Sequence, residues 1–150
     1  MSYSFLKLIH ILSATLMIGT GFGSAFYLFF TYRSGDIRTL RQVLKLVILA
    51  DTFFTAPSVI IQLLTGLLLS YSLSLTYTRW FWIVLSSSII IFVLWIRAAY
   101  LQIRLSKKLD QCDELTPEFH RDMRWWVILG VPSFALSIFI YYMMVYKAFL

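Results

Sequence analysis

The stretch FLKLIHILSATLMIGTGFGSAFYLFFT, residues Phe5–Thr31, decides the fold of this 150-residue chain. One lysine and one histidine are its only ionisable side chains apart from a tyrosine. A helix needs about 20 mostly apolar residues to cross a hydrocarbon core about 30 Å thick, and this run is long enough. It exceeds the apolar region of a signal peptide and has no small-residue cleavage site near its end. The stretch therefore predicts a retained transmembrane helix.

Three further runs of this kind follow, over residues 43–71, 80–104 and 125–146. The whole chain is 60% hydrophobic and 13% charged, whereas a water-soluble domain is about half apolar and a quarter charged. The four runs occupy so much of the chain that no separate soluble domain fits. The sequence predicts an all-α, integral membrane four-helix bundle that forms one domain over residues 1–150.

The basic residues predict how the bundle is oriented. Most of them flank the first and third connections between helices, and the positive-inside rule places such connections in the cytoplasm. Both termini are then expected on the outer, periplasmic side of a bacterial inner membrane. The residues of the two rich connections are Arg33, Arg38, Arg41, Lys45, Arg104, Lys107, Lys108, Arg121 and Arg124, against Lys7, Arg79 and Lys147 on the other side. The net charge of +6 thus reports topology and not a nucleic-acid surface.

The third connection, residues 107–123, is the one sizeable polar segment of the sequence. Within it, Thr116-Pro117-Glu118 is typical of a helix start. We expect a short amphipathic turn there, at the cytoplasmic surface. Cys112 lies in this segment and, as the only cysteine, cannot form an intrachain disulfide.

Two ionisable residues lie at similar depth in neighbouring spans. Asp51 is roughly 12 Å from the cytoplasmic end of the second run, and Arg97 roughly 10 Å from that of the third. Because isolated charges in hydrocarbon are costly, we predict a buried ion pair between Asp51 and Arg97. The pair either sets helix register or serves as a proton relay or an anchor for an anionic ligand.

His10 lies near the outer end of the first run and shares one helical face with Ala14, Met17 and Gly21. Imidazole is a common ligand of haem iron, and a small residue one turn later lets a flat macrocycle approach the helix. A histidine hydrogen-bonded to its neighbours is the alternative. His120 precedes the fourth run on the opposite side of the bilayer, so the two histidines cannot ligate one haem.

Small residues and prolines add two expectations. Gly19 and Gly23 form a GxxxG motif, extended backward by Thr15, which favours close helix packing with a second copy or a membrane partner. Pro57 and Pro132 lie within the second and fourth runs and are expected to kink them. The sequence contains no carboxylate pair, CxxC, HExxH or nucleophile triad, which argues against a hydrolase.

The chain resembles a bacterial group of four-helix membrane proteins known only as a domain of unknown function. The resemblance covers nearly the whole chain. It lies in the stretches HILSATLMIGTGFGSAF (10–26), LADTFFTAPSVIIQLLTGLLL (49–69), WIRAAYLQIRL (95–105) and FHRDMRWWVILGVPSFALSIFIYYMMVYKAF (119–149).

A more distant resemblance is to the HemJ-type protoporphyrinogen oxidases. It implies a haem b site with the first-helix histidine, His10, as an iron ligand. The family's lysine of the third helix has no counterpart here, where Arg97 is the charge inside that run. The matching positions are Lys7 and His10, Pro57 through Thr65, Gly66 and Leu67, His120-Arg121, Val131-Pro132, and Lys147.

Three functions follow as hypotheses. The first is a haem-b-binding redox protein that acts with quinone or a porphyrin-like substrate, with Phe22 and Phe26 lining the haem pocket. The second is a non-enzymatic membrane subunit or assembly factor that docks through Gly19 and Gly23. The third is a small oligomeric transporter with Asp51 and Arg97 as a charge gate.

Overall fold

The computed structural model describes residues 2–112 and 114–146, and the described residues form helices joined by short turns. In chain order these are α1 (Tyr3–Ser34), α2 (Ile37–Ala50), the π-helix η1 (Asp51–Thr55), α3 (Ala56–Ser72), the 3-10 turn η2 (Leu75–Tyr77), α4 (Arg79–Gln111) and α5 (Pro117–Tyr146). Because α2, η1 and α3 follow one another without a break, they form one rod. Four rods result, and all four are long and apolar enough to span a membrane.

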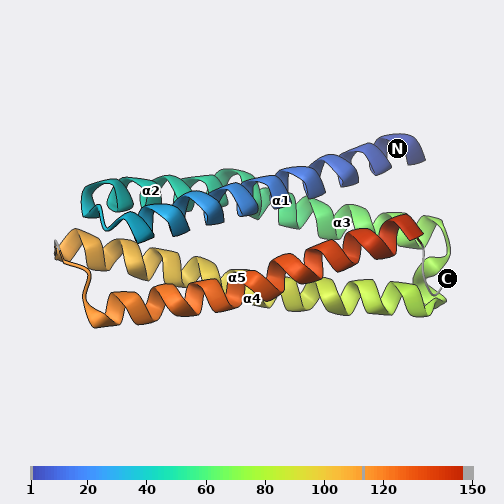
Figure 1. The fold of residues 1–150 in the computed structure, drawn as a ribbon. Coiled ribbons are helices and arrows are strands. Elements are labelled where there is room, and N and C mark those ends of the chain that lie inside the picture. Colours follow the sequence, from blue (N-terminus) through green and yellow to red (C-terminus); the bar gives the residue numbers. More distant parts are fainter. Residues whose placement is uncertain (1, 113, 147–150) are drawn as a thin grey trace.

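The four rods run alternately up and down, as Figure 1 shows. One end of the bundle, the terminal end, holds both chain termini and residues 73–78. The other, the loop end, holds the α1–α2 and α4–α5 connections. The predicted all-α membrane bundle is confirmed, and both termini lie at one end. Which side of the membrane that end faces stays a prediction, and Lys147, one of its expected cations, lies outside the described residues.

At the loop end the helices continue beyond the apolar runs. The second rod begins at Ile37 and not near residue 43, and α4 continues to Gln111. Helix α5 begins at Pro117, where Thr116 Oγ1 accepts a hydrogen bond of 3.2 Å from the amide of Phe119. The helix start was predicted correctly, but the expected amphipathic turn over residues 107–123 was wrong. Charged residues mark the end of a hydrophobic run in the sequence. The helix itself can continue through them when their side chains form ion pairs or hydrogen bonds.

The tight α1–α2 corner depends on two residues. Gly35 has a φ of 74°, a left-handed conformation that glycine adopts at no steric cost, and it ends α1. Asp36 then caps α2 by accepting a hydrogen bond of 3.2 Å from the amide of Thr39. The hydrogen bonds from the Thr39 side chain and amide hold the pKa of Asp36 below its usual value. A two-residue connection is therefore sufficient to reverse the chain.

The main hydrophobic core lies at the loop end, and it is built like that of a water-soluble bundle. Apolar residues from α1, α2, α4 and α5 meet there at low exposure. They are Leu28, Leu40, Leu44, Val47, Leu105, Leu109, Phe119, Met123 and Trp126. A smaller cluster of Trp80, Phe81 and Met143 joins α4 to α5 at the terminal end. There the indole of Trp80 donates a hydrogen bond of 2.8 Å to the carbonyl of Met143.

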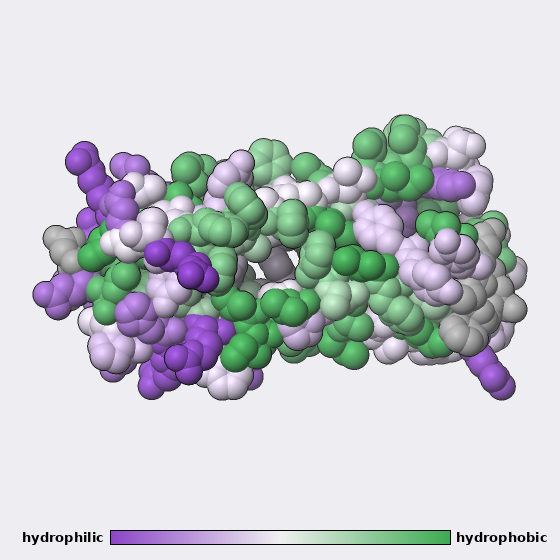
Figure 2. Space-filling view, in the orientation of Figure 1, coloured by the Kyte–Doolittle hydropathy of each residue, from purple (hydrophilic) through white to green (hydrophobic). Residues whose placement is uncertain are grey.

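The rods are arranged as two closely packed pairs. Helix α1 packs along α3, and α4 packs along α5, while α2 with α4 and α1 with α5 supply the contacts between the pairs. Figure 2 shows an apolar middle, a strongly polar loop end, and a small opening between the pairs near the centre. The two pairs are thus joined most firmly at the loop end.

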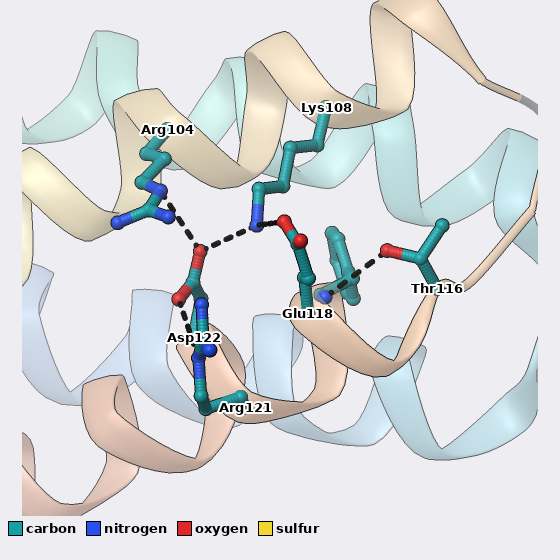
Figure 3. A network of polar contacts seen from close by, with 7 residues as sticks. Arg104, Lys108, Thr116, Glu118, Arg121 and Asp122 are labelled. Carbon is teal, nitrogen blue, oxygen red and sulfur yellow. Dashed lines mark hydrogen bonds and ion pairs between the residues drawn. The ribbon is translucent and has the colours of Figure 1, made fainter.

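Charged residues reinforce that end. Asp122 of α5 is almost fully buried and lies between two cations of α4, with Arg104 Nε at 3.1 Å and Lys108 Nζ at 2.8 Å from Oδ2 (Figure 3). Between α2 and α4, Lys45 Nζ lies 2.9 Å from the carboxylate of Asp110. Arg41 Nε donates a hydrogen bond of 3.0 Å to the carbonyl of Leu109. The cations that predict topology thus also join the helices.

We expect Asp122→Asn to lower the free energy of unfolding by about 2 kcal/mol, because Arg104 and Lys108 would lose a buried partner while staying partly exposed. The matched control, Asp110→Asn, removes a carboxylate that is 46% exposed and should cost less than about 1 kcal/mol. Reversible unfolding in mixed micelles measures both. An equal loss of unfolding free energy in the two variants would contradict the expectation that the buried carboxylate of Asp122 contributes more than the exposed one of Asp110.

Candidate functional site

The strongest polar cluster within the spans surrounds His10 in the terminal half of the bundle. The imidazole of His10 on α1 contacts two side chains of α3, with Nδ1 at 2.9 Å from Thr65 Oγ1 and Nε2 at 3.0 Å from Gln62 Nε2. Ser13, one turn later on α1, donates a hydrogen bond of 2.6 Å to Gln62 Oε1. The cluster joins α1 to α3 within the predicted spans, where hydrogen bonds between helices take the place of bonds to water.

The neighbouring bonds form one consistent network around the imidazole of His10. The hydroxyl of Thr65 donates its one hydrogen to the carbonyl of Ile61 at 2.6 Å, so it accepts from His10 Nδ1. The amide nitrogen of Gln62 is a donor, so His10 Nε2 accepts from it. With the Gln62 amide in this orientation the bonds match an imidazole with its hydrogen on Nδ1, and both ring nitrogens have a partner. His10 matches the hydrogen-bonded alternative of the sequence analysis.

The surroundings of His10 leave no place for a macrocycle in this conformation. A Cβ atom added at Gly66 would lie 3.1 Å from Cε1 of His10, so the ring packs directly on the α3 backbone. Ala14, expected to face a haem, is only 9% exposed. An iron atom at Nε2 would have to displace Gln62. The described residues therefore do not fit haem b without separating α1 from α3.

The other residues proposed for the haem pocket lie apart from His10. Met17 and Gly21 are partly exposed farther along the same face. Phe22 stacks on Phe134 of α5 with ring centroids 5.1 Å apart, and Phe26 packs on Phe30 of its own helix. At 1.5 Å per residue, Phe22 and Phe26 are roughly 18 and 24 Å from His10 along the axis. The expectation that they line a pocket around His10 was wrong.

Asp51 is buried, as predicted, but Arg97 is not its partner. Thr55 Oγ1 donates a hydrogen bond of 2.7 Å to Asp51 Oδ1, and the side chain of Gln102 on α4 faces the same carboxyl group. Arg97 is exposed, and the structure, which describes both residues, shows no ion pair between them. The depth of each residue stays a prediction, and the rotation of each helix about its axis also decides which residues meet. The proposed charge gate is thus not assembled.

The two prolines have different local effects. Asp51 begins the π-helix η1, which ends just before Ala56 and Pro57, and the amide of Ala56 bonds to the carbonyl of Asp51. A wider turn at this point accommodates the ring of Pro57, which lacks an N–H and would crowd the preceding turn. Helix α5 continues through Pro132, and Figure 1 shows its ribbon changing direction near the middle.

The GxxxG motif lies on the side of α1 opposite the contact with α3, and Thr15 at its edge shares a hydrogen bond with Tyr141 of α5. Cβ atoms added at Gly19 and Gly23 would meet no heavy atom within 4 Å. A shallow groove of about 550 Å³ lies beside Gly19, lined by Leu12, Thr15, Leu16, Gly19 and Thr20. At 100° per residue, Gly19 is half a turn of the helix away from His10. Helix α1 therefore has a face fixed to α3, and on the opposite side the described residues leave room beside Gly19 and Gly23.

Sequence reasoning found His10 but not its partners. Ser13, Gln62 and Thr65 are polar residues within apolar runs, a signal that marks helix–helix contacts in membranes. Gln62 and Thr65 are three residues apart and thus on one face of α3, as the pair of bonds to His10 requires.

A family model described as a predicted integral membrane protein (DUF2269) matches residues 4–148. No curated protein and no solved structure matches the chain.

We expect Thr65→Val to destabilise the protein by about 1 kcal/mol, because His10 Nδ1 loses its acceptor inside the membrane. Thr52→Val is the matched control, since the Thr52 hydroxyl makes the same kind of bond to the carbonyl four residues earlier but is exposed. It should change stability little. Reversible unfolding in mixed micelles compares them, and an equal effect of both would show that the His10 cluster contributes nothing.

Proposed function

We propose that this chain, which belongs to the DUF2269 family of predicted integral membrane proteins, is a non-enzymatic membrane subunit that associates through the glycine face of α1. The observation that carries the proposal is that a Cβ atom added at Gly19 or Gly23 would meet no heavy atom within 4 Å in the described part of the chain. Lipid chains are as apolar as leucine, so helices associate in bilayers where small residues let their backbones approach. The open face has that composition.

A second copy of the chain is the partner that the face fits best. A glycine ridge is complementary to itself, so two copies related by a twofold axis present the same surface to each other. The opposite face of α1 is held by the His10 cluster, and Phe22 stacks on Phe134 of α5. Because α1 is already anchored, little ordering is needed when a second helix packs on it.

Haem b binding is a second candidate, and one observation favours it. His10 and Thr65-Gly66, from two distant stretches that carry the likeness to HemJ-type oxidases, lie in contact. Binding would require that Gln62 release His10 Nε2 and that α1 move away from α3. The transporter hypothesis has no comparable support, because its Asp51–Arg97 gate is not assembled.

We expect Gly19→Leu combined with Gly23→Leu to weaken association of two copies by about tenfold or more, because the side chains would hold the backbones apart. Gly130→Leu is the control, since Gly130 on α5 also meets nothing within 4 Å. Energy transfer between labelled copies, diluted stepwise in lipid, measures the change. An association that both variants weaken equally, or that neither weakens, would overturn the proposal.

Absorption spectra of the purified protein separate the two candidates. A subunit without haem shows no Soret band when prepared from haem-replete cells. A Soret band that is present in the wild type and lost in His10→Ala would replace the first candidate with the second, because His10 is then an iron ligand.

A further inference from the structure

A second groove lies at the loop end between α1 and α5, on a level different from that of the glycine face. Its volume is about 380 Å³. The residues that line it are Phe29, Tyr32, His120, Met123, Arg124, Val127 and Ile128. We propose that this groove binds one anionic phospholipid, with the phosphate at Arg124 and an acyl chain along the apolar wall.

The groove crosses the boundary between the apolar runs and the polar loop end. Phe29 belongs to the first run, and Val127 and Ile128 to the fourth. Tyr32 and Arg124 lie just beyond these runs. Trp125, which is 54% exposed, marks the same level, where amphipathic rings prefer the membrane–water interface. The polar lining is therefore at headgroup depth, and the apolar lining continues into the hydrocarbon.

Arg124 is the cation that makes the groove selective for a negative charge. Arg104, Lys108 and Arg121 each lie within 4 Å of the Asp122 carboxylate, so each already has an anionic partner. Arg124, by contrast, forms no ion pair with any residue in the described part of the chain. An arginine at the headgroup level can bind a phosphate through two N–H groups at once. A zwitterionic lipid carries a positive charge in its own headgroup, so its phosphate gains less from binding Arg124.

Tyr32 and His120 supply a second donor. The hydroxyl of Tyr32 and Nδ1 of His120 are 2.6 Å apart. A neutral histidine and a tyrosine together carry two polar hydrogens, and the bond between them uses one. Whichever tautomer is present, one hydrogen is left, on His120 Nε2 or on the Tyr32 hydroxyl. A phosphate oxygen beside Arg124 can accept it.

The apolar wall distinguishes a lipid from a free phosphate. The wall formed by Phe29, Val127 and Ile128 has no polar group that a free phosphate could bind. An acyl chain, by contrast, can pack against this wall and cover its apolar surface. The inference is independent of association through Gly19 and Gly23, because the two grooves share no residue.

The test is native mass spectrometry of the purified full chain with phosphatidylglycerol or phosphatidylcholine in the detergent. We expect one phosphatidylglycerol to be retained in preference to phosphatidylcholine. Arg124→Gln should weaken its retention about fivefold, the loss expected for one surface cation that faces anionic headgroups. The control, Arg38→Gln, removes an exposed arginine of α2 that does not line the groove and should leave retention unchanged.

A second variant tests the apolar wall without changing charge. Val127→Trp fills the groove and should weaken retention of phosphatidylglycerol as well. Equal loss in Arg124→Gln and Arg38→Gln would overturn the proposal in favour of a general surface charge. Displacement of the lipid by inorganic phosphate, with no effect of Val127→Trp, would overturn it in favour of a free-phosphate site.

Discussion

The constraint on which the rest of this structure depends is that a polar group inside the hydrocarbon has no water to bond with. His10 meets it with Thr65 and Gln62, and Asp51 meets it with Thr55. In each case the side chain is satisfied by hydrogen bonds within or between neighbouring helices and not by an opposite charge. Polar residues in the spans therefore act as attachments that set which faces of the helices meet, and apolar residues fill the remaining contacts.

The loop end obeys a different rule, because water is available there. Its helices extend beyond the apolar runs, bury a core around Leu40 and Leu105, and hold charged residues in pairs such as Lys108–Asp122. The terminal half of the bundle is thus held together as in a membrane protein, whereas the loop end is held together as in a soluble helical bundle. The two helix pairs are joined firmly at the loop end, where a hydrophobic core and ion pairs both connect them. Nearer the terminal end, the His10 cluster and the Trp80–Met143 bond each act within one pair.

The sequence was sufficient for the helices, because length and hydropathy depend on residues close together in the chain. It was sufficient for the start of α5 at Thr116-Pro117-Glu118, where capping is also local. It was insufficient for the Asp51–Arg97 pair, because depth follows from counting residues whereas the rotation of one helix against another depends on packing over its whole length. The same reason explains why His10 was found and Gln62 was not. Helix length at the loop end was underestimated because the hydropathy of one segment does not reveal the ion pairs that its flanking residues form with another helix.

Helix α1 shows how these attachments bear on function. Its His10 face contacts α3, whereas a Cβ atom added at Gly19, half a turn away, would meet nothing within 4 Å among the described residues. If the histidine held a cofactor, it would have to give up the bonds that fix α1 to α3, and the open face would lose its rigid support. The two candidate functions thus make opposite demands on the same helix. A fixed α1 suits the proposed docking and a displaced α1 would be needed for haem, so the Gln62–His10 contact is the point at which the two proposals differ.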